Sequence, residues 1–284
     1  MTGTIVYGSE LSLERKGILK EKVEALVSTG KRIPCLAVIL VGNNPASLSY
    51  VKGKEKGCAQ VGMTSRFFHL EEDASQEELE KVIVQCNEDP EIDGILVQLP
   101  LPKGLDEKKA IDTISPDKDV DGLHRINVGR MYLKEKGFIP CTPKGIMALL
   151  EKMGCEIDGK RAVVIGRSRL VGEPVAKLLQ DKNATVTICH SHTKDLPAVC
   201  READILIAAI GRAKMIDHTY VKEGAYVVDV GINRDETGHL VGDVDFDDVR
   251  EHTTAITPVP KGVGPMTICM LLENTFQAYE DKMK

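Results

Sequence analysis

Short apolar segments alternate along the chain with longer segments in which apolar residues recur at helical spacing. The apolar segments are CLAVILV from residue 35, SRFFHL from 65, DGILVQL from 93, RAVVIG from 161, TVTIC from 185, DILIAAI from 204 and AYVVDVG from 225. Strands of this kind, separated by helices, favour βαβ units and mainly parallel sheets. The pattern therefore predicts an α/β fold.

The predicted strands fall into two groups, which indicates two domains. Residues 116–143 separate the groups, and their proline and glycine content is typical of loops, with a short helix expected at 127–132. We interpret this stretch as the crossing between domains, and the final residues, from Pro265, have the apolar spacing of a helix.

Composition narrows the class of protein. The chain has 284 residues, 42% of them hydrophobic, and a formal net charge of -6, which argues against broad nucleic-acid binding. The N-terminus lacks the pattern of a secretory signal, and no apolar stretch is long enough to span a bilayer, so we expect a cytoplasmic protein without a membrane partner. The eight cysteines are far apart without a CxxC pair, which favours buried free thiols over disulfides or a metal site.

The segment PASLSYVKGKEKGC carries the first candidate chemistry. On a helix starting near Ala46, Tyr50 and Lys54 share one face, while Lys52 and Lys56 point roughly the opposite way. A flat ligand could lie on Tyr50 beside Lys54. An exposed tyrosine followed by a solvated lysine would have the same spacing, so this pair alone leaves both interpretations open.

RAVVIGRSRLVGEPVAKLL reads as a buried strand, a tight turn at Gly166 and a helix beginning near Leu170. A helix N-terminus offers free N–H groups to a pyrophosphate. The spacing from Gly166 to Gly172 matches the usual dinucleotide motif only in part, so a glycine needed simply for a strand-to-helix turn stays an alternative.

The segment after the second strand of this unit favours NADP over NAD. It reads HSHTK, with no carboxylate before Asp195, whereas NAD-selective folds place an acid there to bind the ribose hydroxyl. Arg167 can donate to the 2'-phosphate. For His190 and His192, an ordinary surface loop is the simpler interpretation.

Several motifs agree in order and spacing with one family. Besides Tyr50 and Lys54, they are VQLP at 97–100, DVDG at 119–122, GRSxxVGxP at 166–174 and PVPKGVGPMT at 258–267. From about residue 34 to residue 275 the chain resembles the bifunctional methylenetetrahydrofolate dehydrogenase/cyclohydrolase family. The resemblance implies NADP-dependent oxidation of 5,10-methylenetetrahydrofolate and hydrolysis of the methenyl product to 10-formyltetrahydrofolate in one shared site, with tetrahydrofolate derivatives as ligands and a homodimer as the assembly.

The resemblance also implies a domain plan. Residues 1–120 plus 266–284 would form the catalytic, folate-binding domain, 121–143 the crossing, and 144–265 a Rossmann-like NADP-binding domain. The C-terminal helix would return to the first domain.

The site residues implied by the resemblance have distinct roles. Lys54 would transfer protons, Gln98 would hold it by a hydrogen bond, Asp121 would bind the pterin and Tyr50 would stack on a flat ring. The full substrate-binding set would be Tyr50, Lys54, Val97, Gln98, Leu99, Asp121, Pro260, Gly262, Gly264 and Pro265. The cofactor-binding set would be Gly166, Arg167, Ser168, Val171, Gly172, Ser191 and Ile232, with no metal.

Two further expectations concern charge. Lys54 acts as a base only when neutral, and burial together with the charges of Lys52 and Lys56 would lower its pKa. Asp117 and Asp119 are expected to be turn and capping residues.

One position departs from the family pattern. Lys261 stands where the family usually has glycine, which puts in doubt a requirement for positive φ there. Lys261 could also approach the glutamate tail of folate, although a solvated lysine is the simpler role.

Other functions remain to be weighed. A dehydrogenase without the hydrolase step would share most of these residues, and a folate- or nucleotide-binding protein without activity would lack reason to keep Tyr50, Lys54, Gln98 and Asp121 together. A short-chain dehydrogenase is excluded, because its Tyr and Lys follow the cofactor glycines, whereas here they precede Gly166.

Overall fold

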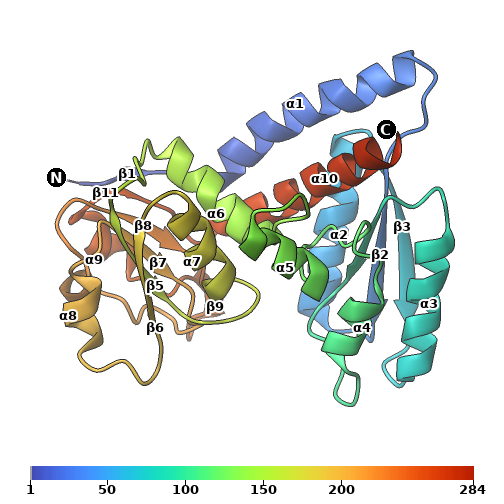
Figure 1. The fold of residues 1–284 in the computed structure, drawn as a ribbon. Helices are drawn as coiled ribbons and strands as arrows, with labels where there is room; N and C mark the ends of the chain where they lie inside the picture. The colour runs from blue at the N-terminus through green and yellow to red at the C-terminus, as the bar shows by residue number, and fades with distance from the viewer. Residues whose placement is uncertain (1) are drawn as a thin grey trace. The chain divides into compact units, whose positions relative to one another are not determined.

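The computed structural model of the protein describes residues 2–284, which form two compact units (Figure 1). The six-stranded unit consists of residues 2–13 and 142–267, and the three-stranded unit consists of residues 14–141 and 268–284. Two long helices, α1 (Gly8–Ser28) and α10 (Val263–Lys282), begin in the six-stranded unit and continue in the three-stranded unit. The C-terminal helix therefore returns to the N-terminal part of the chain, as expected.

The six-stranded unit is built on a parallel sheet with the strand order β1-β11-β8-β7-β5-β6. Its strands are β1 (Thr4–Ile5), β5 (Arg161–Ile165), β6 (Thr185–Cys189), β7 (Ile205–Ala208), β8 (Ala225–Asp229) and β11 (Thr253–Ile256). Its other elements are α6 (Cys141–Lys152), α7 (Gly172–Asp181), α8 (Leu196–Cys200), η1 (His218–Tyr220), α9 (Phe246–Arg250) and the antiparallel pair β9 (Asn233–Arg234) and β10 (Leu240–Val241).

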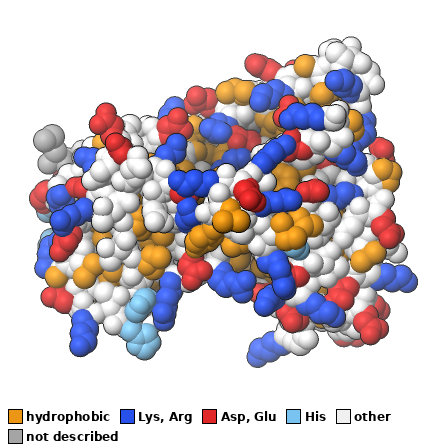
Figure 2. Space-filling view, in the orientation of Figure 1, with side chains coloured by type: hydrophobic (Ala, Val, Ile, Leu, Met, Phe, Trp, Pro, Cys, Tyr) orange, Lys and Arg blue, Asp and Glu red, His pale blue; other side chains and the backbone are white. Residues whose placement is uncertain are grey.

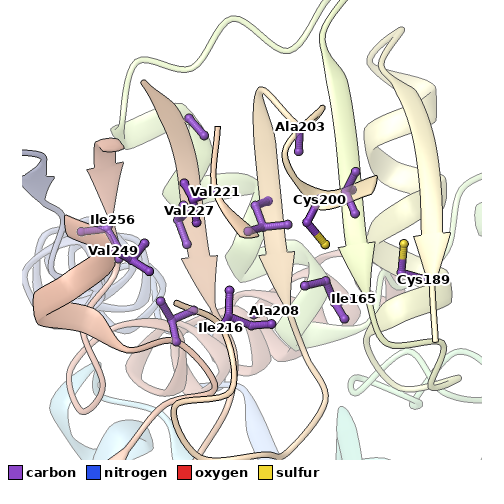
Figure 3. Close-up of a cluster of buried hydrophobic side chains, with 14 residues drawn as sticks. Ile165, Cys189, Cys200, Ala203, Ala208, Ile216, Val221, Val227, Val249 and Ile256 are labelled. Carbon is purple, nitrogen blue, oxygen red and sulfur yellow. The ribbon is translucent and has the colours of Figure 1, made fainter. Parts of the chain in front are cut away.

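One hydrophobic core of this unit joins the central strands to the short helices (Figure 3). Ile165, Val227 and Ile256 project from three different strands, and Cys200 and Val249 come from α8 and α9. Because β5, β7 and β8 are almost wholly buried, their side chains are apolar on both faces, which produces the continuous apolar runs seen in the sequence.

The three-stranded unit has a parallel sheet in the order β3-β2-β4. Its elements are β2 (Cys35–Val41), α2 (Pro45–Gln60), β3 (Thr64–Leu70), α3 (Gln76–Glu88), β4 (Gly94–Val97), α4 (Glu107–Thr113) and α5 (Arg125–Leu133). Every residue of the central strand β2 is buried. Its alternate residues Ala37 and Ile39 pack with Leu79 and Ile83 of α3, so the remaining residues face the opposite layer.

All the strands predicted from apolar runs are confirmed, and so is the helix expected at 127–132, which is α5. The strands β1, β9, β10 and β11 were not predicted, because they are two to four residues long and have no long apolar run.

The structure divides the chain differently from the expected boundaries at two places. The N-terminal residues belong to the six-stranded unit, because β1 extends that sheet by pairing with β11 (Thr4 with Ala255). Residues 121–141 belong to the three-stranded unit and are not a separate crossing. Asn274 of α10 holds them there by donating from Nδ2 to the carbonyl oxygens of Val120 (2.9 Å) and Ile139 (3.1 Å).

All eight cysteines are free and buried, as predicted. On the face drawn in Figure 2, Lys and Arg side chains are interspersed with Asp and Glu. None of the helices within residues 2–284 is both long and apolar enough to cross a membrane.

Candidate active site

Helix α2 places Lys54 in a buried environment. Asn44 caps the helix, with its Oδ1 accepting from the N–H groups of Ala46 (3.0 Å) and Ser47 (3.1 Å). Lys54 lies on the buried face of the helix, which also carries Ser47, Val51, Gly57 and Cys58. The lysine is only 8% exposed, whereas Lys52 and Lys56 on the other side of the helix are solvated, as predicted.

The Lys54 ammonium meets Gln98 at the end of β4. Lys54 Nζ donates to Gln98 Oε1 over 2.7 Å, although the two residues lie far apart in the sequence. The side-chain Nε2 of Gln98 donates to the carbonyl of Leu99 (2.7 Å), and its backbone N–H donates to Ile39 of β2 (2.8 Å). The amide therefore has a fixed orientation, with its oxygen toward the lysine.

Burial lowers the pKa of Lys54, because removing an ammonium from water disfavours its charged form. The neighbouring Asp121 and Cys141 act in the opposite direction and raise it. The predicted contribution of Lys52 and Lys56 is wrong: the structure attributes the lowered pKa to burial, and both of these lysines point into solvent.

Asp119 and Asp121 lie in the DVDG segment after α4, where Asp119 is bridged to Ile95 of β4, and the two aspartates have different surroundings. Asp119 is buried and accepts from the N–H groups of Leu123 (3.2 Å) and His124 (2.9 Å) and from Asn127 Nδ2 (2.9 Å). Its predicted role in the turn is confirmed, whereas the cap of the following helix α5 is His124, whose side chain accepts from the N–H of Ile126. Burial raises the pKa of Asp119 to about 7, against the effect of these hydrogen bonds.

Asp121 is partly buried and lies close enough to Lys54 for the two charges to interact. Burial raises its pKa, while the charge of Lys54 and the thiol of Cys141 lower it. Gly122 next to it has φ of 73°, and a Cβ there would be 2.6 Å from the backbone nitrogen of Pro140, so the loop requires glycine at this position. Lys54, Gln98 and Asp121 are thus brought together in the three-stranded unit.

The remaining predicted substrate-binding residues differ in exposure. Tyr50 is 42% exposed on α2, one turn before Lys54, so its ring is available to a ligand. The side chain of Val97 is part of the core under α3 and α4, so only its backbone can meet a ligand. Leu99 is partly buried.

The glycine turn after β5 has a steric reason at both glycines. Gly166 has φ of 121°, and a Cβ there would be 2.2 Å from the carbonyl oxygen of Ala209. A Cβ on Gly172 would be 2.2 Å from the carbonyl oxygen of Gly166. The helix begins at Gly172 and not near Leu170, because Ser168 Oγ accepts from the N–H groups of Val171 (3.2 Å) and Gly172 (3.4 Å) and closes the turn first.

The loop after β6 presents the predicted 2'-phosphate contacts to solvent. Ser191 is exposed there, and Arg167 is exposed after β5. His190 Nδ1 accepts from the N–H of His192 (3.2 Å), which describes an ordinary turn. Asp195, the first acid of this segment, accepts from the N–H of Ala198 (3.4 Å) and caps α8. Its carboxylate is therefore engaged with the helix.

The segment after β11 contains the other predicted substrate-binding residues, Pro260, Gly262, Gly264 and Pro265, which all belong to the six-stranded unit. Lys261 has φ of 80°. The inference from the lysine at this position is therefore wrong: the backbone adopts the left-handed conformation although the residue is not glycine. A Cβ on Gly262 would be 2.3 Å from the carbonyl oxygen of Pro258, so the chain turns tightly here.

Ile232 follows β8 and is 49% exposed. Sequence reasoning missed two buried residues near it, Asp229 at the end of β8 and Asp243 after β10, which bind the loops on both sides of it. An aspartate ending an apolar strand in VVDVG was a visible signal for Asp229, whereas nothing local marked Asp243. Within residues 2–284, no three His, Cys, Asp or Glu side chains lie close enough together to hold a metal ion.

A parallel six-stranded sheet with a glycine turn, joined in one chain to a second unit that holds a buried lysine, defines a two-domain dinucleotide-dependent enzyme architecture. Two family models match this chain. The tetrahydrofolate dehydrogenase/cyclohydrolase catalytic domain matches residues 6–121, and the NAD(P)-binding domain of the same family matches residues 140–283. The chain belongs to the tetrahydrofolate dehydrogenase/cyclohydrolase family.

Individual relatives are similar over nearly the whole chain. The bifunctional protein FolD of Listeria innocua is 55% identical over 276 residues, which are 97% of each chain. The structure of the Campylobacter jejuni FolD enzyme has a TM-score of 0.96 at 49% identity, covering 98% of this chain and 99% of that one. The Trypanosoma brucei dehydrogenase-cyclohydrolase, solved with NADP cofactor and inhibitor, has a TM-score of 0.95 at 37% identity, covering 99% of both chains.

Proposed function

We propose that this chain oxidises 5,10-methylenetetrahydrofolate with NADP+ and hydrolyses the methenyl product to 10-formyltetrahydrofolate, with Lys54 as the proton-transfer group. The hydrogen bond of 2.7 Å from Lys54 Nζ to Gln98 Oε1, in a buried place beside Asp121, carries this proposal. Membership of the dehydrogenase/cyclohydrolase family over both parts of the chain supports the two activities and the NADP cofactor.

Lys54 can serve the hydrolysis because its environment favours the neutral amine more than water does. A neutral Lys54 donates one N–H to Gln98 and keeps a lone pair that can accept a proton from the attacking water. The resulting ammonium is stabilised by the nearby Asp121 and can pass its proton to the departing nitrogen. Burial, which lowers the pKa of Lys54, therefore favours the neutral base, and Asp121, which raises this pKa, stabilises the ammonium that forms.

The substrate would be held by groups that the protein leaves available. The carboxylate of Asp121 can accept two parallel hydrogen bonds from a pterin, and the exposed ring of Tyr50 can stack on a flat substituent. Val97 and Leu99 would contribute backbone groups at the strand end. For Pro260, Gly262, Gly264 and Pro265, a role in substrate binding is part of the proposal.

The residues after β5 and β6 fit a dinucleotide phosphate. The close approach of Gly172 to Gly166 excludes side chains, and Ser168 and Val171 shape the turn before the N-terminus of α7. Arg167 and Ser191 are exposed donors for a 2'-phosphate, and Asp195 is engaged as a helix cap. Bound NADP+ would accept a hydride from the one-carbon bridge of the folate, with Ile232 beside its nicotinamide half.

The finer assignments extend this proposal. We assign NADP binding to the six-stranded unit, and folate binding to the three-stranded unit together with residues 260–265. We expect a cytoplasmic homodimer that binds neither nucleic acid nor membranes. The alternative of a dehydrogenase without the hydrolase step is decided by the same assays as the role of Lys54.

Replacing Lys54 by Met tests the central assignment. Lys54→Met keeps the aliphatic chain but cannot transfer protons, so hydrolysis of methenyltetrahydrofolate should fall by roughly a hundredfold or more. Lys56→Met is the matched control, because Lys56 lies on the exposed side of the same helix. Both variants are compared with the wild type by absorbance assays of methenyl consumption and of NADPH formation, after circular dichroism shows that they are folded.

Near wild-type hydrolysis by folded Lys54→Met would refute the role of the lysine. A wild type that forms NADPH from methylenetetrahydrofolate but does not consume the methenyl compound would establish the dehydrogenase alone.

A further inference from the structure

A buried carboxylate outside the proposed chemistry connects two loops at the ligand edge of the six-stranded sheet. Asp243 is fully buried, and both of its oxygens are used. Oδ2 accepts from the N–H groups of Ile210 (2.7 Å) and Gly211 (3.0 Å), and Oδ1 accepts from the N–H of Arg212 (2.8 Å) and from Asn233 Nδ2 (2.9 Å).

The segments that Asp243 joins leave adjacent strands. Residues 210–212 follow β7, and residues 231–233 follow β8, its parallel neighbour. The carboxyl ends of parallel strands are where open α/β sheets bind their ligands. Ile232, between Gly231 and Asn233, is half exposed at this edge. Asp243 thus sets the distance between two neighbouring loops of the cofactor side.

A second carboxylate holds Asp243 itself. Asp229 Oδ1 accepts from the N–H groups of Gly231 (3.0 Å) and Asp243 (3.0 Å), and Oδ2 accepts from the N–H of Val244 (3.0 Å). The glycines next to these two carboxylates could not be replaced by residues with a side chain. A Cβ on Gly231 would be 2.3 Å from Asp243 Oδ1, and one on Gly242 would be 1.8 Å from Asp229 Oδ2.

We infer that Asp243 is a positioning residue for hydride transfer, because it fixes the loops after β7 and β8 that would border the nicotinamide half of the cofactor. The inference rests on the proposed assignment of Ile232 and of NADP binding to this edge. Hydride transfer depends on the alignment of two bound ligands, so a small displacement of these loops lowers the rate of that step. The hydrolysis needs no cofactor, and its proposed groups, Lys54, Gln98 and Asp121, lie in the other unit.

Asparagine cannot replace Asp243 here. All four partners are donors, and an amide would direct its NH₂ group at two of them. Asp243→Asn therefore breaks two hydrogen bonds and turns the NH₂ group of the amide toward two N–H donors. The size of the side chain does not change. Asn233→Ala is the milder variant, since it removes one contact and leaves the three backbone bonds in place.

The test compares Asp243→Asn and Asn233→Ala with the wild type and with Asp235→Asn. Asp235 is the matched control, because it accepts from the N–H groups of Thr237 and His239 within the β9–β10 turn and joins no strand ends. For each purified protein, NADP affinity is measured by calorimetry, and kcat and KM are measured for the dehydrogenase and, without NADP, for the cyclohydrolase.

We expect Asp243→Asn to lower the dehydrogenase kcat at least tenfold, and Asn233→Ala to lower it a few-fold. The cyclohydrolase kcat should stay within twofold of the wild type in both variants, and Asp235→Asn should change neither activity. If Asp243→Asn does not fold, Asn233→Ala tests the inference, by the ratio of its dehydrogenase kcat to its cyclohydrolase kcat.

Two results would overturn the inference: an equal loss of both activities in Asn233→Ala, or an unchanged dehydrogenase kcat in Asp243→Asn with only a lower melting temperature. A wild type without NADP-dependent oxidation would instead refute the proposed function, so the two failures are distinguishable.

Discussion

Each unit of the protein contains a pair of aspartates next to one strand of its sheet, β4 in the three-stranded unit and β8 in the six-stranded unit, and the two pairs are used differently. In the three-stranded unit the pair is Asp119 and Asp121, and in the six-stranded unit it is Asp229 and Asp243. In both pairs the first aspartate accepts backbone N–H groups, and burial raises its pKa to about 7. The second aspartate differs: Asp243 is consumed by four donors of the protein, whereas Asp121 lies beside the ammonium of Lys54.

This difference separates carboxylates that shape a site from one that can act in it. A carboxylate whose oxygens all accept protein donors has no capacity left for a ligand, and it serves by holding loops in place. Asp121 retains the capacity to bind a donor pair and also influences the pKa of the neighbouring lysine. Asp119 holds the loop that carries Asp121, and Asp229 holds Asp243 in the same way.

The largest expected effect is that variants of the two aspartate pairs lose affinity for different ligands. Asp121→Asn should weaken folate binding on the order of a hundredfold, because its amide would face donors of the pterin, and should leave NADP affinity unchanged. Because Asp121 raises the pKa of Lys54, its removal should also shift the rising limb of the cyclohydrolase pH–rate profile to lower pH.

Calorimetric titration of Asp121→Asn with each ligand, together with that pH–rate profile, provides the measurement, and Asp243→Asn should show the opposite preference. Similar losses for both ligands in both variants would break the comparison.

A smaller effect concerns stability and pH at Asp119. Its folded pKa of about 7 lies above the value of about 4 in an unfolded chain, so the folded state holds a proton that the unfolded state releases between these limits. The contribution is present below about pH 4 and is lost as pH rises through 7, at about 1.4 kcal/mol for each pKa unit. Asp119→Asn should remove this share of the decline in the free energy of unfolding and leave the share of Asp229, whose pKa is also raised to about 7.

Urea denaturation of the wild type and Asp119→Asn at several pH values from 5 to 8 measures this slope. The exposed Asp117→Asn serves as the control and should keep the wild-type slope. An unchanged slope in Asp119→Asn would show that its carboxylate is ionised throughout, as in an exposed aspartate.

The smallest expected effect is on stability, at Lys261 in the loop after β11, where the backbone conformation and not a carboxylate sets the shape of the loop. Lys261 has positive φ, which costs a non-glycine residue about 1 kcal/mol or more. Lys261→Gly should therefore stabilise the protein by up to about 1 kcal/mol, after allowance for the greater freedom of glycine in the unfolded chain.

Differential scanning calorimetry compares Lys261→Gly with Lys103→Gly, an exposed lysine of another loop that lies outside the positive-φ region. The control should lose stability, because there glycine changes only the unfolded chain. Equal losses at both positions would contradict the expected relief at residue 261.

Local patterns were enough to predict much of the molecule. The apolar runs identified the strands of both sheet centres, because a strand buried on both faces has to be apolar at successive positions. The spacing in α2 placed Tyr50 and Lys54 on the same face of one helix, and the absence of an acid before Asp195 favoured NADP over NAD. The position of β1 could not be predicted, because two residues contain no periodicity and their pairing with β11 spans nearly the whole chain.

The sequence by itself therefore determined the α/β class, the order of the main elements, the free state of the cysteines and the family motifs. Only the tertiary structure decided that burial, and not neighbouring lysines, lowers the pKa of Lys54. It also decided that Asn274 holds the segment after Asp121 and that Asp243 joins two strand ends. Propensity and hydrophobic spacing act between near neighbours, whereas desolvation and buried hydrogen bonds depend on residues that only folding brings together.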